Sequence, residues 1–404
     1  MKVLFHTHYY LPETGPATKR ISGLAENLKD FGHQVEILTG FPSYPSGIKP
    51  DGYREKVHME ETINGIKIYR YYTYASPNVN LFNRLLNYLS LMISSLFFLF
   101  KRKKYDLIIT TSPPLFVCLS SYIIAKFKKT PLIFDIRDIW PDVAEEIGQI
   151  NKDGIKYKVL NKLANILYKK SDLITTVTNM KKEKLISKGI NNNKIKYISN
   201  GFDKSFLENN VDKKIINKFE LEDKFTLVYA GTVGLAQGID IIIDAAKKLK
   251  KYDNLQFLII GDGLEKKELE QRAKKENLSN LKFLGLYPHE KIYTFLKYSD
   301  ASIIPLKNEN LKDSVPSKLF ESLGAGCPVI LSAAGESKRI LEYANGGLAV
   351  EPGNSSALKD AILELYKNED MKKEFSNKGQ KYVLENFTRE KIAKKLENEL
   401  LSYL

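Results

Sequence analysis

The segment Val315–Ile330 combines residue types and a spacing that suit the binding of a phosphate group. Pro316 fits the first position of a helix, where no N–H is needed, and the free amides of a first helical turn lie at the positive end of the helix dipole. Lys318 adds a positive charge there, and Glu321, about one turn later, can accept hydrogen bonds from a vicinal diol such as a ribose. The segment therefore predicts a clamp for a nucleoside diphosphate. A buried amphipathic helix with a surface lysine and glutamate would have the same spacing.

Two other loops suit an anion, because each follows an apolar strand and precedes a helix. The loop Gly231–Gly238 follows the strand expected at 225–230 and offers backbone amides. The loop after the first strand contains Gly15, which permits a close approach of the backbone, and Arg20 follows about one turn into the helix. A dinucleotide-binding protein would carry GxGxxG at this turn, so the single glycine argues against a nicotinamide or flavin oxidoreductase.

The segment Asp135–Asp142 directly follows the apolar strand expected at 132–134. It places two carboxylates, Asp135 and Asp138, and the guanidinium of Arg137 at the carboxyl end of a strand. Open α/β sheets bind their ligands at this edge. The segment is therefore a candidate for acid–base chemistry, and an Asp–Arg ion pair that fixes the loop is the structural alternative.

Strand-length apolar runs alternate with helical patterns along the whole chain, which predicts doubly wound parallel sheets. The expected strands fall at 3–5, 35–38, 66–69, 107–110, 132–134, 173–175, 195–198, 225–230, 257–260, 282–284, 301–304 and 329–331. A turn at 200–203 and a charged stretch at 204–224 separate the two series. We therefore predict an α/β chain with Rossmann-like domains at 1–203 and 204–380 and a further helix at 381–404.

The composition excludes several classes of protein. A chain of 404 residues with 43% hydrophobic residues can bury two full cores. The only two cysteines, Cys118 and Cys327, argue against a disulfide framework and against a cysteine-rich metal site. The first residues enter a strand directly, without the basic start and apolar core of a signal peptide, which favours a cytoplasmic protein.

Positive charge is concentrated in the first half of the chain. Residues 1–200 contain 30 Lys or Arg and 17 Asp or Glu, a net charge of +13, whereas residues 201–404 contain 32 and 31, a net charge of +1. This asymmetry predicts an anionic partner for the first half, either nucleic acid or the surface of an anionic membrane. A coding bias toward lysine is the alternative, but it does not predict a neutral second half.

Residues 85–100 are the most apolar stretch, and the basic run Lys101–Lys104 follows them. A polar stripe runs along this region at spacings of three and four, formed by Asn80, Asn83, Asn87, Ser90 and Ser94. A helix here would have a broad apolar face, but it is too short and too often interrupted to span a bilayer. The pattern predicts either a helix in the membrane interface, with its basic end on lipid phosphates, or a helix buried in the first domain.

As a set, these segments resemble the retaining glycosyltransferases of family 4, most strongly over residues 229–330. The resemblance covers essentially the whole chain. It implies the GT-B fold, a last helix that crosses back to the first domain, a sugar-nucleotide donor, no cofactor and no catalytic metal. In that family two acidic residues eight positions apart contact the transferred sugar and the donor ribose. Asp313 and Glu321 hold these positions, although aspartate is one methylene shorter than the usual glutamate, and Ser317 and Lys318 between them belong to the implied donor site.

The resemblance also implies roles for the segment Asp135–Asp142, which is similar to the Arg-Asp-Leu-Trp-Pro signature of family 4 enzymes that build bacterial surface polysaccharides. That branch includes N-acetyl-L-fucosamine transferases. Many family members contact the transferred sugar through a histidine in this region, and Asp138 is its expected replacement. The Asp138 carboxylate would accept the proton of the acceptor hydroxyl or orient the sugar, and Arg137 would steady a phosphate or that carboxylate.

Most family members also clamp the donor diphosphate with an arginine and a lysine where Thr232 and Gln237 stand in this chain. Lys318 is the expected replacement, as a point charge that offsets the charge on the departing nucleoside diphosphate. The other implied donor-binding positions are Gly15, Arg20, Gly231, Gly261, Asp262, Gly263 and Leu286, the last four at strand ends that form the nucleobase pocket in the family.

We therefore expect a glycosyltransferase that binds a UDP-sugar on residues 225–380 and an acceptor on residues 1–200. The expected sugar is N-acetylfucosamine or another N-acetylhexosamine, and the expected acceptor is a saccharide on undecaprenyl diphosphate, for a capsule, an O-antigen or another surface polysaccharide. The expected location is the cytoplasmic face of the bacterial inner membrane, as a peripheral protein on its anionic surface.

Two other classes of protein remain as alternatives. A non-catalytic sugar-nucleotide-binding protein would keep Lys318 and Glu321 but would not need Arg137 and Asp138. A nucleic-acid-binding protein would explain the positive charge. However, the basic residues lack the aromatic-interleaved motifs of known binding modules, so we expect no nucleic-acid partner.

Overall fold

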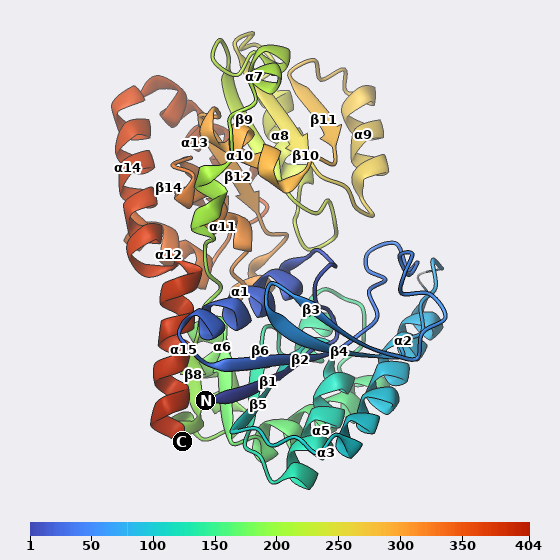
Figure 1. The fold of residues 1–404 in the computed structure, drawn as a ribbon. Helices are drawn as coiled ribbons and strands as arrows, with labels where there is room; N and C mark the ends of the chain where they lie inside the picture. Colours follow the sequence, from blue (N-terminus) through green and yellow to red (C-terminus); the bar gives the residue numbers. More distant parts are fainter. Residues whose placement is uncertain (79) are drawn as a thin grey trace. The chain divides into compact units, whose positions relative to one another are not determined.

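A computed structural model describes residues 1–78 and 80–404, which form two compact units (Figure 1). Unit 1 consists of Met1–Asn200 together with Arg389–Leu404, and unit 2 consists of Gly201–Thr388. The predicted domain boundaries lie nearby, after residues 203 and 380. The prediction of an α/β fold with two doubly wound sheets is confirmed, because each unit is built on a largely or wholly parallel sheet.

The sheet of unit 1 has the strand order β3-β4-β2-β1-β5-β6-β7-β8. Neighbouring strands are parallel, except that the edge strand β3 is antiparallel to β4. Strands β5, β6 and β7 are buried at every residue, as expected for central parallel strands covered on both faces. The strands are β1 Lys2–His6, β2 Gln34–Gly40, β3 His58–Ile63, β4 Ile66–Tyr71, β5 Leu107–Ser112, β6 Leu132–Ile136, β7 Leu173–Thr176 and β8 Ile195–Tyr197.

The helices of unit 1 fall into two groups. Helices α2, η1, α3, α5 and α6 contribute side chains to one core cluster with the sheet. Helix α1 packs instead against the C-terminal helix α15, so the two ends of the chain lie side by side in Figure 1. The helices are α1 Pro16–Asp30, α2 Leu81–Ser94, η1 Ser95–Phe100, α3 Leu115–Lys128, α4 Asp142–Glu146, α5 Ile155–Lys170, α6 Asn179–Ser187, η2 Asn192–Lys194 and α15 Arg389–Tyr403.

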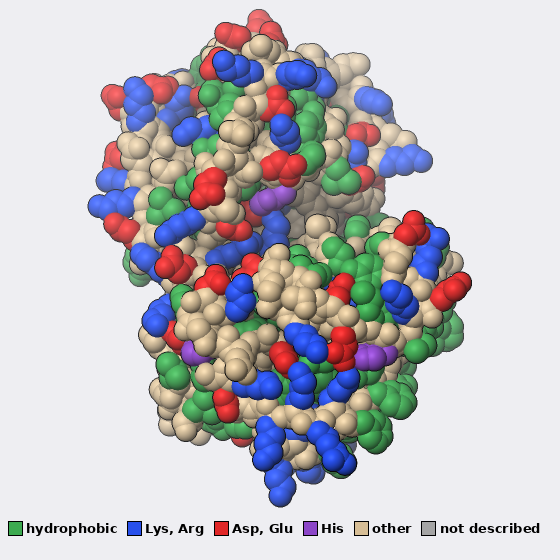
Figure 2. Space-filling view, in the orientation of Figure 1, with side chains coloured by type: hydrophobic (Ala, Val, Ile, Leu, Met, Phe, Trp, Pro, Cys, Tyr) green, Lys and Arg blue, Asp and Glu red, His purple; other side chains and the backbone are tan. Residues whose placement is uncertain are grey.

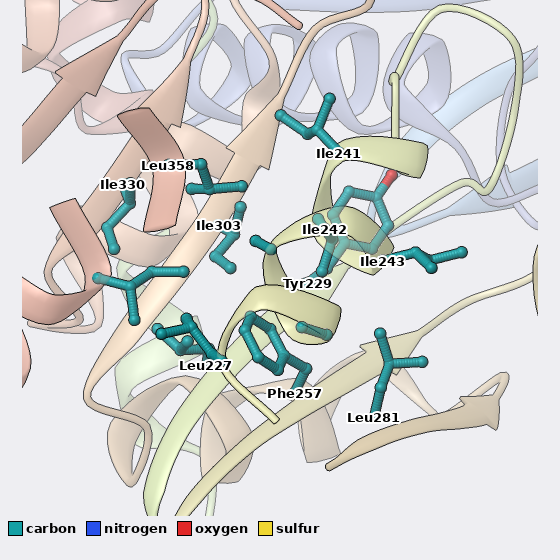
Figure 3. Close-up of a cluster of buried hydrophobic side chains, with 14 of the residues drawn as sticks. Leu227, Tyr229, Ile241, Ile242, Ile243, Phe257, Leu281, Ile303, Ile330 and Leu358 are labelled. Atoms are coloured by element: carbon teal, nitrogen blue, oxygen red, sulfur yellow. The ribbon is translucent and has the colours of Figure 1, made fainter. Parts of the chain in front are cut away.

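The sheet of unit 2 has the order β11-β10-β9-β12-β13-β14 and is parallel throughout. The strands are β9 Phe225–Ala230, β10 Leu255–Ile260, β11 Leu281–Gly285, β12 Ala301–Pro305, β13 Val329–Ser332 and β14 Gly347–Val350. The helices are η3 Lys204–Glu208, α7 Lys213–Phe219, α8 Asp240–Lys248, α9 Lys266–Lys275, α10 His289–Lys297, η4 Glu309–Leu311, α11 Ser317–Gly324, α12 Glu336–Ala344, α13 Ser355–Lys367 and α14 Glu369–Asn386. Apolar side chains of the strands, such as Leu227 and Phe257, pack against Ile241–Ile243 of α8 (Figure 3).

The strand order of unit 2 reverses at β9, which has β10 on one side and β12 on the other. At such a switch point the connections leave in opposite directions, and a crevice opens at the carboxyl ends of the strands. The loop 231–238 follows β9, and the segment that leads to α11 follows β12. The fold therefore brings two predicted ligand-binding segments to the edge where a ligand is expected.

The apolar stretch expected at 85–100 begins earlier in the structure, because α2 starts at Leu81 and continues into η1. By length and composition alone, Leu81–Phe100 is long and apolar enough to cross a membrane, and it is the one such segment among residues 1–78 and 80–404. The criterion is met by the longer segment that starts at Leu81, so the statement that residues 85–100 are too short to span a bilayer stays a prediction. Core helices of soluble proteins can pass the same test.

Candidate functional site

Two glycine-containing loops meet at the switch point of unit 2. The N–H of Val233, in the loop after β9, donates to the carbonyl oxygen of Asp262, in the loop after β10, at 2.9 Å. A Cβ atom on Gly261 would lie 1.8 Å from the carbonyl oxygen of Gly231, and one on Gly263 would lie 2.1 Å from that of Val233. No side chain fits into such gaps. The two loops can pack this closely only because glycine occupies both positions.

The amine of Lys318 lies beneath the first of these loops. Its Nζ donates to the hydroxyl oxygen of Tyr229 at 2.8 Å and lies 3.9 Å from the centre of the same ring. The Tyr229 hydroxyl, whose oxygen is drawn red in Figure 3, donates in turn to the carbonyl oxygen of Thr232. A Cβ atom at Gly231 would come within 2.7 Å of the Lys318 Nζ. The amine is thus held in one position between β9 and the glycine loop.

Burial changes the protonation of this amine. Desolvation lowers the pKa of Lys318 to about 7, although the nearby carboxylate of Glu321 acts in the opposite direction. The ring of Tyr229 offers its negative face to the cation but does not neutralise it. Glu321 is therefore too weak a partner to restore the usual pKa of the amine, and a bound phosphate would be a stronger one.

Helix α11 presents the other predicted residues of this segment. It begins at Ser317, which is exposed, so Pro316 is the N-cap and not the first helical residue as expected. Glu321 is partly exposed, and its Oε1 accepts a hydrogen bond of 3.1 Å from Nε2 of His289 at the start of α10. Asp313 is buried ahead of the helix. Lys318 and Glu321 thus lie about one turn apart on the same face of one helix.

The remaining predicted donor positions lie in loops at the carboxyl edge of the same sheet. Thr232, Asp262 and Leu286 are exposed, and Gln237 is partly buried. The Asp262 carboxylate accepts a 2.8 Å hydrogen bond from the N–H of Gly263, so it stabilises the turn in which it lies. Leu286 has 75% of its surface exposed, which leaves an apolar side chain beside the end of β11.

In unit 1, Arg20 is committed to a buried ion pair. Its guanidinium donates to both carboxylate oxygens of Asp135, at 2.7 and 3.0 Å, and to the carbonyl oxygens of Ile198 and Ser199. Burial raises the pKa of Asp135, but the charge of Arg20 and hydrogen bonds from Arg20, Thr175 and Thr111 outweigh it and hold the pKa below its usual value. This geometry gives no support to the prediction that Arg20 contacts the donor, and Gly15 serves as the N-cap of α1.

The other residues of the segment Asp135–Asp142 have separate partners. Arg137 donates to the hydroxyl of Thr111 at 3.1 Å and to the carbonyl oxygen of Pro113, so it braces its loop against the end of β5. The carboxylate of Asp138 is partly exposed and lies 3.7 Å from the Nζ of the buried Lys181. Asp135 thus pairs with Arg20, which lies outside the segment, and not with Arg137 as the structural alternative expects, whereas Asp138 keeps an accessible carboxylate beside a cation.

The sequence patterns do not single out three residues that the structure places at these positions: Tyr229, His289 and Lys181. Tyr229 has the position and type of an ordinary strand residue, and its partner lies 89 positions away. His289 directly follows a Tyr-Pro turn after β11, and this turn lies at the carboxyl edge of the same sheet. The sequence could therefore have indicated that His289 lies near the site. Lys181 lies in a lysine-rich helix whose composition indicates only a solvated surface.

Within residues 1–78 and 80–404, no group of three or more His, Cys, Asp or Glu side chains is arranged to hold a metal ion. Both cysteines are buried and free of disulfide bonds.

Comparison with known proteins identifies the family of both halves. Residues 15–201 match the model of the glycosyl transferase 4-like domain, and residues 211–382 match that of the glycosyl transferases group 1. The colanic acid biosynthesis glycosyl transferase WcaI of Escherichia coli is 26% identical over 90% of this chain and 92% of its own.

Solved structures show the same fold. The Anabaena protein HepE, crystallised with UDP, is 17% identical and superposes over 100% of both chains with a TM-score of 0.75. The sucrose-phosphate synthase of Thermosynechococcus elongatus is 15% identical and reaches 0.78 over 100% of both chains. With two parallel-sheet units, two matching family models and these neighbours, the chain belongs to the GT-B glycosyltransferases.

Proposed function

We propose that this protein is a retaining glycosyltransferase that moves a sugar from a UDP-sugar to a lipid-linked saccharide. The observation that carries the donor part is the partly buried Lys318 amine, held by Tyr229 against the glycine loop, with Glu321 one turn along the same helix. A site of this kind offers a cation for a diphosphate and a carboxylate for a ribose. The neighbour HepE has been crystallised with UDP and with UDP-glucose, which supports the choice of UDP.

The proposed reaction breaks the bond between the anomeric carbon and the β-phosphate oxygen, and UDP leaves with that electron pair. The acceptor hydroxyl oxygen forms the new bond on the same face of the sugar, and its proton passes to Asp138 or to the departing diphosphate. Lys318 and the first-turn amides of α11 offset the charge that develops on the diphosphate. Glu321 holds the ribose, and Asp313 and Asp138 contact the sugar. No cofactor is required, since these groups supply the positive charge.

We further propose a surface-polysaccharide role with an undecaprenyl-diphosphate-linked acceptor, as in capsule or O-antigen synthesis. The similarity to WcaI, a colanic acid biosynthesis glycosyl transferase, supports that class of product. The sugar we propose is N-acetylfucosamine or another N-acetylhexosamine. An acceptor of this kind is anionic and lies in a membrane, which fits the positive charge of residues 1–200 and the largely exposed apolar segment Leu81–Phe100. The protein would work as a peripheral protein at the cytoplasmic face.

A screen of donors tests the proposal. UDP release is measured for a panel of UDP-sugars, with and without lipid-linked acceptors, and one donor is expected to release UDP faster when an acceptor is present. The Asp138→Asn variant should slow this release without losing the donor. A non-catalytic binding protein would bind a UDP-sugar and release no UDP with any acceptor, and that outcome would favour the alternative function.

The Glu321→Ala variant should weaken UDP binding by about 1.5 to 3 kcal/mol, the range for losing hydrogen bonds to a charged group. This corresponds to a dissociation constant roughly 10- to 150-fold higher in calorimetry. The matched control is His289→Asn, which removes one hydrogen-bond partner of Glu321 but leaves the carboxylate available to the ribose. Unchanged UDP affinity in Glu321→Ala would remove this residue from the donor site.

The affinity for UDP should fall as pH rises above 7. The pKa of Lys318 is lowered to about 7, so the amine is protonated below that pH and neutral above it. A bound diphosphate favours the charged amine and raises this pKa, so binding takes up a proton between the two values. Affinity should then drop by up to about tenfold per pH unit. Calorimetry in buffers of different ionisation enthalpy should detect proton uptake at pH 8 in the wild type and none in Lys318→Met. Equal uptake in both would contradict the assignment.

A further inference from the structure

Helices α2, η1, α3 and α5 form one layer on one face of the sheet of unit 1. Side chains from all of them, including Leu91, Phe98, Ile124 and Leu167, enter a single core cluster with the strands. Helix α3 contacts α2, η1 and α5. Because these helices cover the same face of the sheet, their outer sides point away from it in a common direction. Helix α6 also enters this cluster, through Leu185, and it carries Glu183. We call the four elements α2, η1, α3 and α5, with the basic run Lys101–Lys104 that follows η1 and with Lys129 that follows α3, the outer layer.

The outer layer contains no acidic residue and carries the whole positive excess of the first half of the chain. Residues 81–104, 115–129 and 155–170 contain five, three and five Lys or Arg, respectively, and no Asp or Glu. The rest of residues 1–200 contains 17 residues of each sign. A general lysine bias would spread over the unit and would not leave its remainder neutral. The charge asymmetry is therefore a property of this one layer.

The polar stripe of α2 points inward. The Asn87 side chain bonds to Nε2 of His8 at 2.7 Å and to the carbonyl oxygen of Tyr74. The Ser90 hydroxyl accepts from the N–H of Tyr74 at 2.8 Å, and the Ser94 hydroxyl donates to the carbonyl oxygen of Tyr72 at 2.6 Å. These contacts tie the helix to the segment after β4. The broad apolar face is consequently turned outward, opposite to the arrangement of an ordinary surface helix.

Large apolar side chains are exposed on every helix of the outer layer. Their exposed fractions reach 67% at Phe82, 81% at Phe100, 73% at Phe127 and 80% at Ile155. In Figure 2 hydrophobic side chains lie at the surface over α2. The full set is Leu81, Phe82, Leu85, Ile93, Phe97, Phe100, Phe127, Ile155, Val159 and Ile166. Exposed apolar side chains gathered in this way mark an interaction surface.

Helix α5 supplies much of the available charge beside this apolar surface. The run Lys101–Lys104 supplies less than its sequence suggests, because Lys101 pairs with Glu60 and Lys103 pairs with Glu36. On α5, all five lysines are exposed. Lys162 lies in the same row of the helix as Ile155, Val159 and Ile166, and the others lie around this row: Lys156, Lys158, Lys169 and Lys170. A basic helix with an exposed apolar stripe is the pattern of an element that lies in a membrane interface.

We propose that the outer layer is a docking surface for an anionic lipid bilayer, with α5 as a second contact element beside α2 and η1. The inference rests on the proposed function, which requires a lipid-linked acceptor. Charge and polarity select this occupant. A second copy of the chain would bring the same lysines against each other, and a nucleic acid would leave the exposed phenylalanines and isoleucines without an apolar environment. A bilayer with anionic headgroups accommodates both features at once.

Vesicle co-sedimentation of the full-length protein tests the role of α5. The test variant carries Lys156→Gln, Lys158→Gln and Lys162→Gln. Its matched control carries Lys267→Gln, Lys274→Gln and Lys275→Gln on α9 of unit 2, where the three side chains are likewise exposed. A second test variant, Val159→Gln with Ile166→Gln, removes apolar surface without changing charge. The vesicles are phosphatidylcholine with or without phosphatidylglycerol, at low and high salt.

The wild type and the α9 control should bind anionic vesicles, and binding should weaken with salt. The α5 charge variant should bind about 10²-fold more weakly, and the apolar variant should also lose binding. The proposal would be overturned if the α5 charge variant and the α9 control lost vesicle binding equally, or if both α5 variants bound as well as the wild type. It would also be overturned if the wild type bound neutral vesicles as well as anionic ones. UDP affinity, measured on the same preparations, should be unchanged. Absence of UDP binding in the wild type would instead refute the donor site, whatever the vesicles show.

Discussion

Replacing Lys318 by methionine should lower the turnover number by about 10²- to 10³-fold, the usual effect of removing one group that stabilises charge in a transition state. The negative charge on the departing diphosphate grows as the glycosidic bond breaks, so the interaction with the amine is stronger in the transition state than in the bound donor. The Michaelis constant should therefore change much less than the turnover number. Steady-state kinetics with the best donor and acceptor measure both quantities.

Two controls separate the amine from its surroundings. Lys312→Met removes an exposed lysine close to the same helix and should leave turnover unchanged. Tyr229→Phe keeps the ring beneath the amine but removes the hydroxyl that bonds to it, and it should give an intermediate loss. A raised Michaelis constant with normal turnover in Lys318→Met would show that the amine binds ground state and transition state equally. Lys318 would then have no catalytic role.

Breaking the pair between Arg20 and Asp135 should lower the free energy of unfolding of unit 1 by about 3 to 5 kcal/mol, because it leaves an unpaired charge in the interior. Both side chains are at most 3% exposed. The guanidinium also donates to the carbonyl oxygens of Ile198 and Ser199. Arg20→Met or Asp135→Asn produces this state. Urea unfolding can be followed by Trp140, the single tryptophan, which lies in unit 1 and reports on that unit alone.

An exposed pair in the same unit provides the matched control. Arg54 lies 3.3 Å from Asp51, with side chains 63% and 92% exposed, so Arg54→Met should change the free energy of unfolding by less than about 1 kcal/mol. The contradicting result is an Arg20→Met variant that unfolds at the same urea concentration as the wild type and binds UDP more weakly. In that case the guanidinium would be a donor contact, as the family resemblance implies, and its assignment to a structural ion pair would be wrong.

The sequence predicts the parallel strands well because their burial requires continuous apolar runs. The two strands that it does not predict lack this signal. Strand β3, His58–Ile63, lies at the edge, pairs antiparallel with β4 and alternates exposed with partly buried residues, two of them glutamates. Strand β14, Gly347–Val350, starts with glycine and is partly buried at every position. Strand β14 is held by its pairing with β13 more than by its own composition. Strand β3 pairs with β4 across the two-residue turn Asn64-Gly65, which is a local hairpin signal that the search for apolar runs misses.

For the site, local spacing finds the helix of Lys318 and Glu321, because a helix start, a cation and a carboxylate all lie within a few residues. The roles of arginines are harder to predict. Arg20 has the position of an anion contact, but it pairs with a residue 115 positions away. Tyr229 presents the converse case, because an ordinary strand residue becomes the partner of the key amine only when β9 and α11 meet. Such pairings depend on the strand order, which the spacing of residues does not specify.

The central claim is transfer of a sugar from a UDP-sugar to a lipid-linked acceptor, and mass spectrometry of the acceptor tests it most directly. With the donor that gives the fastest UDP release, each UDP formed should be matched by one acceptor molecule heavier by one sugar residue, and Lys318→Met should suppress both products together. If UDP appeared without any gain in acceptor mass, the protein would be hydrolysing its donor. If the donor bound and stayed intact with every acceptor, the protein would be a non-catalytic binder, and the proposed function would be wrong.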